Sequence, residues 1–490
     1  MSHLTTSYDF DVMVIGAGPA GYVAAIRAAQ LGFKTASIDS WTDAQGEQKL
    51  GGAYVNAGCI ACVALLESAK VHHLLHQGLA EHGLSVAGIN IDIAQTQARK
   101  TNIINQVNQK IVNIFADLHI QRIHGRGKLI KARQVEVTFN GPSDRSGPCE
   151  KKVFSAKYII LASGSSAITP DCAKIDHHAI LNTTDALNLD HIPKHIGILG
   201  AGVIGLELGS IWRKFGAQVT LLEAQNQFLP ILDQQISQLA LQLYREQGLD
   251  IRLSTRVVAA KVDSTGGVTV NYQDQQGNQV AQFDKFIVAS GRKPNTENLA
   301  GPEAQLLLDE NGFVHVDEQC GTNLPGVYAI GDLTLLGPML THKGIEEGIF
   351  VAEHIAQQHV RINYQIIPNI VYTTPEIAWI GPSEQALKAI GERIKTSVFP
   401  LHANTKALAL DKTSGMVKLI SHADSDKILA VHIIGEHASE IIAEAVLALE
   451  FSASAEDLAR TIHAHPTFSS ALHEAALAIS NRAIHLPPGF

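Results

Sequence analysis

Apolar and polar residues follow one another near the start of the chain in an order that predicts a strand, a turn, a helix and a second strand. Residues 10–15, FDVMVI, form a short apolar run, and a glycine-rich turn follows at once. The next residues, GYVAAIRAAQLG, have the apolar spacing of a helix that ends at Gly32. A second apolar stretch, KTASID, ends at Asp39, 23 residues after Gly16.

The same order of elements returns later in the chain. The run IGIL precedes Gly200, and the segment LELGSIWRKFG continues from the turn as a helix. The stretch AQVTLLE then ends at Glu223, again 23 residues after the first glycine of its turn. One glycine-rich turn is weak evidence, because such turns also form for purely structural reasons. Two copies with equal spacing indicate a repeated nucleotide-binding unit.

The residue types of this repeat suit a dinucleotide. Glycines let the backbone approach a pyrophosphate at a helix N-terminus, and the carboxylate accepts hydrogen bonds from an adenosine ribose. Glu223 favours NAD over NADP, because a carboxylate repels a 2′-phosphate and residues 224–228, AQNQF, contain no arginine. The predicted cofactor-binding residues are Gly16, Gly18, Pro19, Ala20, Gly21 and Asp39 in the first unit and Gly200, Gly202, Gly205 and Glu223 in the second.

The rest of the chain predicts a nested α/β fold, with two Rossmann-like dinucleotide-binding domains and an α+β C-terminal domain. Residues 158–164 and 286–292 form apolar strands with Ser-Gly at their ends, which suggests two crossing points between domains. Asp332 follows a further strand and stands at the entry to a helical region. The predicted domains are residues 1–163 with 293–362, residues 164–292, and residues 363–490.

Composition favours small-molecule chemistry. The chain has 490 residues, of which 46% are hydrophobic, so it can form several buried cores. A formal net charge of -9 gives no electrostatic footprint for nucleic acid or for an anionic membrane. We expect a cytoplasmic protein, since neither a signal peptide nor a long uncharged apolar span is evident. The five cysteines do not suggest a disulfide scaffold; they are Cys59, Cys62, Cys149, Cys172 and Cys320.

Several longer segments resemble one known family. They include GAGPAGYVAAIRAAQLG, GGAYVNAGCI, GAGVIGLELGS, ASGRKPN, GVYAIGD, VYTTPEIAWIG and the tail RAIHLP. The chain resembles the pyridine nucleotide–disulfide oxidoreductases, and its C-terminal third narrows the resemblance to dihydrolipoamide dehydrogenase. The resemblance implies that the first unit binds FAD, that the second binds NAD, and that the last domain forms a homodimer whose active sites combine both subunits. It also implies cofactor contacts for Gly51, Gly52, Gly127, Ser163, Gly164, Gly291, Arg292, Gly331 and Asp332.

The thiol centre departs from that family. The family uses a C-x4-C pair, of which Cys59 matches the second cysteine while Tyr54 stands at the position of the first. The customary proline, serine and lysine are replaced by residues 61–63, Ala-Cys-Val. The loss of the lysine leaves Glu207 without its usual ion-pair partner. We therefore expect Glu207 either to reach water or to stay neutral.

The acid/base centre departs as well. His465 matches the family's catalytic histidine, and Pro466 and Thr467 follow it as in the family. Ser470, however, replaces the glutamate that orients this histidine. Glu474 lies one helical turn beyond Ser470 and is a candidate substitute. Without a carboxylate, His465 is a weaker candidate for proton transfer and is equally consistent with an interface histidine.

Several interpretations of the thiols stay open. Cys59 and Cys62 have the spacing of a C-x-x-C redox pair at a helix start, where the helix dipole favours a thiolate. Alternatively, Cys59 acts alone beside the flavin, or both cysteines are only packed side chains. The pair is also half of a zinc site that His463 and His465 would complete. Tyr54 is most simply a packing residue, with hydrogen-bond donation to a substrate as the alternative.

Three functional hypotheses follow. The first is an FAD-dependent, NAD-linked oxidoreductase that exchanges electrons with a dithiol or disulfide through Cys59 and Cys62, with His465 as acid/base. The second is a thiol-independent flavoenzyme that passes electrons from NADH to a quinone, a dye, oxygen or another nucleotide. The third is a flavin-loaded binding subunit that docks a lipoyl-bearing carrier protein without reductase activity.

Overall fold

The computed structural model describes residues 7–43, 46–77, 79, 82–139 and 150–487, and Cys149 lies outside this range. Contacts divide the chain into two compact units. The first unit contains residues up to 64, residues 95–168 and residues 291–364. The second contains residues 65–94, residues 169–290 and the chain from residue 365 onward. Each dinucleotide-type turn therefore belongs to a different unit.

The first unit is built on a parallel sheet with the strand order β3-β2-β1-β5-β16. Apart from Asp11, every residue of β1 is buried, which explains the apolar run in the sequence. Strand β4 (Gln134–Phe139) pairs antiparallel with both β3 and β5. The parallel strands are β1 (Phe10–Ile15), β2 (Thr35–Asp39), β3 (Gln121–Lys131), β5 (Lys151–Leu161) and β16 (Val327–Ala329).

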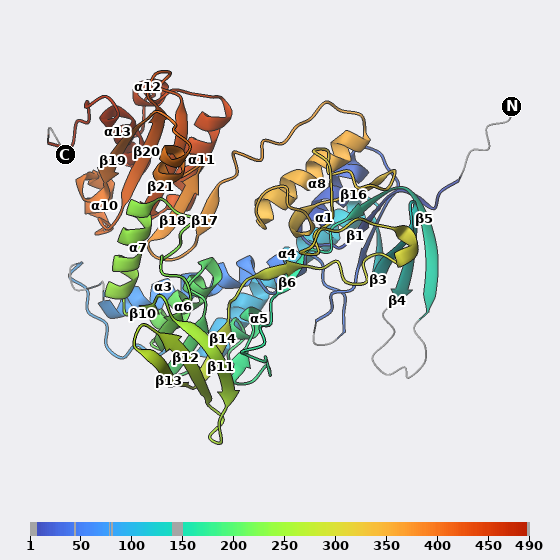
Figure 1. Cartoon of the computed structure of the whole chain (residues 1–490), viewed down its shortest axis with the longest axis horizontal. Coiled ribbons are helices and arrows are strands. Elements are labelled where there is room, and N and C mark those ends of the chain that lie inside the picture. The colour runs from blue at the N-terminus through green and yellow to red at the C-terminus, as the bar shows by residue number, and fades with distance from the viewer. Residues whose placement is uncertain (1–6, 44–45, 78, 80–81, 140–149, 488–490) are drawn as a thin grey trace. The chain divides into compact units, whose positions relative to one another are not determined.

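Helices α1 (Pro19–Gln30) and α8 (Thr341–Ile355) pack against each other in this unit (Figure 1). A Cβ atom at Gly348 would lie 2.6 Å from the carbonyl oxygen of Ala20. Only glycine therefore permits this approach, which holds α8 directly behind the first glycine turn. The other helices are α2 (Gly52–Asn56), α3 (Cys59–Gln77) and α4 (Ile93–Asp117). The chain passes from the first unit to the second within α3 and returns to the first unit near the start of α4.

The second unit repeats the same plan. Its parallel sheet has the order β10-β9-β8-β14-β7, and helix α6 (Val203–Phe215) follows β8 as α1 follows β1. A three-stranded antiparallel sheet, β11-β12-β13, then precedes β14. The repeated strand–turn–helix unit predicted from the sequence is thereby confirmed. The strands are β7 (Ile180–Leu181), β8 (His195–Leu199), β9 (Gln218–Leu222), β10 (Leu249–Arg252), β11 (Arg256–Val262), β12 (Val268–Asp274), β13 (Gly277–Phe283) and β14 (Lys285–Val288).

The C-terminal residues form an antiparallel sheet with the order β17-β18-β21-β20-β19 (Figure 1). Helix α11 (Ala438–Glu450) packs on β18 and β21, and α13 (Ser470–Ala478) packs on β19 and β20. This α+β arrangement completes the predicted fold class, which is confirmed. The strands are β17 (Asn369–Val371), β18 (Glu376–Ile380), β19 (Ile394–Pro400), β20 (Met416–His422) and β21 (Ile428–Gly435).

A buried ionic cluster ties this sheet to the second dinucleotide-binding domain. The Lys418 ammonium donates to both carboxylate oxygens of Asp233 at 2.9 Å and to Glu384 at 2.5 Å. Asp233 also caps helix α7 (Gln234–Glu246) by accepting from the backbone N–H of Gln235. Because of such contacts, the C-terminal sheet groups with the second dinucleotide-binding domain and does not form a third compact unit.

One helical stretch, residues 52–76, is long and apolar enough to cross a membrane by length and composition. The sequence analysis expected no long uncharged apolar span, and Glu67 and Lys70 are charged residues within this stretch. Core helices of soluble proteins meet the same criterion.

Replacing Lys418 by Met is expected to lower the free energy of unfolding by about 3–5 kcal/mol, because it leaves the buried Asp233 carboxylate unpaired. Urea unfolding followed by circular dichroism measures the change. The matched control is Lys388→Met: Lys388 pairs with the same Glu384 but its side chain is 63% exposed, so its loss should cost about 1 kcal/mol or less. Equal effects of the two variants would contradict the assignment.

Candidate functional site

The first glycine turn has a geometry that only glycine permits. Gly16 has a φ of 104°, and a Cβ there would lie 2.2 Å from the carbonyl oxygen of Ala162. A Cβ at Gly21 would lie 1.9 Å from the carbonyl oxygen of Gly16. The turn and the start of α1 are therefore held against the sheet. Gly18 caps α1 without any side-chain hydrogen bond, and Pro19 is at the first helical positions, so the helix N-terminus is available to an anion.

The second glycine turn repeats these features. Gly200 has a φ of 100°, and a Cβ at Gly205 would lie 2.2 Å from the carbonyl oxygen of Gly200. Gly202 caps α6, again without a side-chain hydrogen bond. Both helix N-termini thus have the same form, which fits one pyrophosphate at each.

The two acidic residues are also held in the same way. Asp39 accepts hydrogen bonds from the backbone N–H groups of Ala17 at 2.6 Å and Trp41 at 2.7 Å. Glu223 accepts from the corresponding N–H groups of Ala201 at 2.9 Å and Gln225 at 3.0 Å. Burial raises the pKa of Asp39, although its backbone hydrogen bonds oppose the shift. Each carboxylate is fixed beside its glycine turn, where an adenosine ribose would be recognised.

A second glycine pair lies close to the first turn. Gly51 and Gly52 both have positive φ, and a Cβ at Gly52 would lie 2.7 Å from the Cα of Gly18. Any side chain would fill this space, whereas the bare backbone leaves it open for close approach of a phosphate group. These observations fit FAD at the first turn, with Gly18 and Gly52 among the residues that would hold it.

Asp332 is connected to Arg292 by two hydrogen bonds through the Ser165 side chain. Ser165 Oγ donates to the Asp332 carboxylate at 2.5 Å and accepts from Arg292 Nε at 2.7 Å. Strands β6 (Ser165–Ala167) and β15 (Arg292–Pro294) pair here, so the two predicted crossing points meet. Ser163 Oγ donates to the carbonyl of Asn295 at the same place, next to Gly164. Ser165 was not among the residues predicted from sequence.

The turn that contains Gly331 and Asp332 is braced from behind. The Gly331 N–H donates to the Glu347 carboxylate at 2.6 Å, and the Lys343 ammonium donates to the Gly331 carbonyl at 2.8 Å. Tyr364 also donates to Glu347. Burial raises the pKa of Glu347, against the effect of Lys343. Lys343 and Glu347 are a further pair that the sequence analysis missed, and their i, i+4 spacing in a helix was the available signal.

The remaining predicted cofactor residues have structural contacts only. A Cβ at Gly127 would lie 3.2 Å from the Ile15 side chain and 3.3 Å from the Ile38 side chain, so Gly127 of β3 packs against the ends of β1 and β2. Gly291 has a φ of 113°, and Ile168 donates its N–H to the Gly291 carbonyl. Their cofactor contacts stay predictions.

Cys59 and Cys62 lie in the first turn of α3. Cys59 is exposed, Cys62 is buried, and no disulfide joins the cysteines in the described part of the chain. The Tyr54 phenol lies near Cys59: burial raises the pKa of Tyr54, and the charge of Cys59 raises it further. Burial and then Tyr54 likewise raise the pKa of Tyr22. Tyr54 therefore fills the position of the missing cysteine as part of a small cluster that includes Tyr22.

Glu207 accepts a backbone hydrogen bond in the absence of the family's lysine. Its carboxylate accepts a hydrogen bond from the backbone N–H of Tyr372 at 2.9 Å. The side chain is only partly buried. A backbone N–H at the start of the C-terminal sheet thus donates to Glu207 in place of the missing lysine. Partly buried carboxylates are usually hydrogen-bonded.

His465 contacts a hydroxyl group and no carboxylate among the described residues. Its Nε2 lies 3.0 Å from Thr405 Oγ1. Ser470 does not turn towards the imidazole: its hydroxyl donates to the Thr467 carbonyl and accepts from Asn404 Nδ2. The family's orienting position is therefore occupied by a locally satisfied serine.

His463 forms a complete pair with a glutamate. Its Nε2 lies 2.5 Å from the Glu444 carboxylate, and its Nδ1 donates to the Thr461 carbonyl at 2.8 Å. The hydrogen bond to Glu444 raises the pKa of His463, against the effect of burial. Because both ring nitrogens face acceptor oxygens, these contacts favour the protonated form of the imidazole.

Glu474 contacts His485, not His465, and this corrects its expected role. Its carboxylate lies 2.7 Å from His485 Nδ1 and accepts from the backbone N–H of Ile484 at 2.9 Å. The ring of His485 stacks on that of His465, with centroids 5.8 Å apart and planes 16° from parallel. Among the described residues no group of three or more metal-binding side chains gathers, so the zinc interpretation gains no support.

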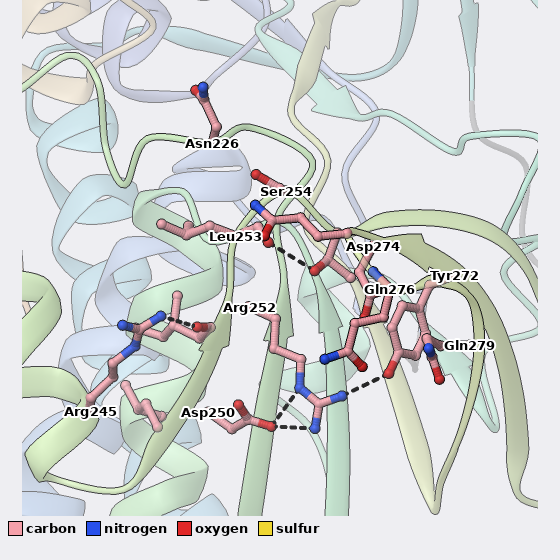
Figure 2. A pocket seen from close by; sticks show the side chains of 14 residues that line it. Asn226, Arg245, Asp250, Arg252, Leu253, Ser254, Tyr272, Asp274, Gln276 and Gln279 are labelled. Carbon is pink, nitrogen blue, oxygen red and sulfur yellow. Dashed lines mark hydrogen bonds and ion pairs between the residues drawn. The ribbon is translucent and has the colours of Figure 1, made fainter.

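One hollow of about 690 Å³ lies in the second unit beside Glu223, because Arg252 and Thr255, which line it, are hydrogen-bonded to the Glu223 backbone. Figure 2 shows Arg252 between Asp250 and Tyr272, to both of which it is hydrogen-bonded. None of the glycines of the second turn, and not Glu223, lines this hollow. The hollow therefore adjoins the residue predicted to recognise an adenosine ribose but does not include the glycine turn.

Two nucleotide-binding units with matched turns define a flavin- and nicotinamide-dependent oxidoreductase. The chain belongs to the pyridine nucleotide-disulphide oxidoreductase family, which matches residues 10–348. Residues 367–476 match the dimerisation domain of that family, which indicates a homodimer. The resemblance stated from the sequence is confirmed, and the protein is an FAD- and NAD-dependent enzyme.

The relatives support the narrower resemblance. The chain is 41% identical to the dihydrolipoyl dehydrogenase of Cupriavidus necator, over 98% of this chain and 100% of that protein. It is 38% identical to the mitochondrial dihydrolipoyl dehydrogenase of Pisum sativum, over 97% and 92%. The flavoprotein disulfide reductase RclA of Escherichia coli, solved as a Cu(II) complex, has a similar structure, with a TM-score of 0.84, 25% identity and coverage of 96% and 100%.

The His463–Glu444 pair predicts a pH-dependent stability. The folded pKa of His463 lies above its ordinary value near 6.5, so its stabilisation is fully present below that value and is lost as pH rises through the raised pKa. Glu444→Gln should therefore lower the melting temperature at pH 6 far more than at pH 9. The expected loss at pH 6 is about 1.5–3 kcal/mol, the range for a hydrogen bond to a charged group. A loss that is equal at both pH values would contradict the pairing.

Proposed function

We propose that the protein exchanges electrons between NAD(H) and a dithiol or disulfide substrate, through Cys59 and Cys62. The observation that carries the proposal is the placement of both sulfurs in the first turn of α3, with Cys59 exposed. A helix N-terminus favours a thiolate, and i, i+3 side chains lie on one face of a helix. The names of the dihydrolipoyl dehydrogenase relatives add support for this substrate class.

The sulfurs would act in sequence. A substrate dithiol loses two electrons and two protons and becomes a disulfide, while an oxidised Cys59–Cys62 pair takes up the electrons as two thiols. Cys59 is the sulfur that an outside thiol reaches, because Cys62 is only 6% exposed. FAD, when bound, supplies the two-electron redox chemistry that links thiols to nicotinamide. Gly16, Gly18, Asp39, Gly52 and Asp332 would hold it.

Proton transfer needs a base, for which the family match offers His465. We also propose a cytoplasmic location and, as partner, a lipoyl-bearing carrier protein, which would present its dithiol on a flexible arm.

A thiol-independent NADH-acceptor flavoenzyme is the second candidate. It is favoured by Tyr54 at the first cysteine position and by the burial of Cys62, which hinders a relay. In this case a quinone or dye takes electrons at the flavin alone.

An anaerobic titration with NADH separates the two candidates. The dithiol proposal expects four electrons per bound FAD, because the cysteine pair is a second two-electron centre. Absorbance of the flavin against added NADH measures the uptake. Saturation at two electrons per FAD would overturn the proposal and leave the second candidate.

Replacing Cys62 by Ser should abolish the second centre. We expect uptake to fall from four to two electrons per FAD and NAD-dependent oxidation of dihydrolipoamide to fall at least about 10³-fold, since a single sulfur cannot close a disulfide. Cys172→Ser, which changes a thiol of the second unit, is the control and should retain both. Undiminished dihydrolipoamide oxidation in the Cys62 variant would rule out the pair.

A further inference from the structure

Two of the histidine–glutamate pairs in the C-terminal domain differ in which ring nitrogen stays available. In the His463–Glu444 pair both nitrogens are donors, and the His463 side chain is only 6% exposed. Such an imidazolium holds structure and accepts no proton. In the His485–Glu474 pair only Nδ1 is engaged, and the His485 side chain is 46% exposed.

The Glu474 carboxylate fixes the state of His485. An ionised carboxylate can only accept hydrogen bonds, so Nδ1 of His485 is the protonated nitrogen and Nε2 carries the lone pair. Glu474 is itself immobilised, because its side chain is 7% exposed and it accepts from the backbone N–H groups of Ile484 and His485. The Nε2 atom of His485 takes part in no contact among the described residues. This is the arrangement that a proton acceptor requires.

His465 is less suited to the task in this chain. The nitrogen that would accept a proton, Nε2, is bound to Thr405 Oγ1, and no carboxylate orients the ring. Yet His485 stacks on His465, so the His485–Glu474 pair lies beside the position that the family match gives to the acid/base. A carboxylate-held imidazole thus lies next to His465 in the fold.

We infer that His485, held by Glu474, is the group that accepts the proton of the substrate thiol. The inference rests on the proposed dithiol reaction. In that reaction the dithiol loses two electrons and two protons and becomes a disulfide; NAD⁺ takes up both electrons and one proton as NADH, and one proton reaches water. Nε2 of His485 takes the proton from the thiol as it becomes the attacking thiolate and then releases it to water. Glu474 stays ionised and stabilises the imidazolium between these steps.

The sharpest variant is His485→Asn. The asparagine amide can still donate to Glu474 in place of Nδ1, but it has no counterpart of Nε2. We expect kcat for dihydrolipoamide oxidation by NAD⁺ to fall about 10²-fold or more relative to NADH-dependent ferricyanide reduction. His422→Asn is the matched control, because His422 also faces a glutamate, Glu392, and should keep the parental ratio.

A chemical rescue excludes a merely structural role. In His485→Ala, added imidazole should restore dihydrolipoamide oxidation in proportion to its concentration, since the side chain it replaces is half exposed. The inference would be overturned if imidazole restored no activity. It would also be overturned if His485→Asn were unchanged while His465→Asn was inactive. Either result would leave the proposed function standing. A parental protein that oxidises no dihydrolipoamide and takes up two electrons per FAD would instead overturn the proposed function, and this inference with it.

Discussion

The close contact between the glycine turn and its helix is the constraint on which the rest of the structure depends. At Gly21 and again at Gly205, a Cβ atom would lie about 2 Å from the carbonyl oxygen of the first glycine of the turn. The absence of side chains brings an uncapped helix N-terminus up to the sheet edge, where its N–H groups can meet a pyrophosphate. The order of the parallel strands and the acid at the end of the second strand complete the same site in both units.

The nucleotide sites and the thiol centre of this chain depart from the family's residues to different degrees. Asp39 and Glu223 keep matching hydrogen bonds, whereas Tyr54 and Ser470 replace the groups that the family uses for disulfide exchange. The replacements do not leave voids. Tyr54 is half-buried near Tyr22, and Ser470 is satisfied by Thr467 and Asn404. Both replaced positions are therefore ordered parts of their own units.

Much of the nucleotide-binding structure could be predicted because it is encoded locally. The strand, turn, helix and acid of each unit lie within about 30 residues, so spacing alone specifies them. The supporting residues could not be predicted in this way. Ser165 meets Asp332 across 167 positions, and Glu347 supports Gly331 only because α8 packs against α1. Such contacts depend on which distant segments the sheet brings together.

The sequence by itself determined the two dinucleotide units, the α+β domain that follows them and the loss of the first cysteine and the orienting glutamate. Only the tertiary structure decided which hydrogen-bond partners the remaining carboxylates have. Glu207 finds a backbone N–H of Tyr372, and Glu474 finds His485 although His465 is the nearer match by motif. The physical reason is that a buried carboxylate takes whichever donor the packed chain presents, and helical spacing alone does not reveal that donor.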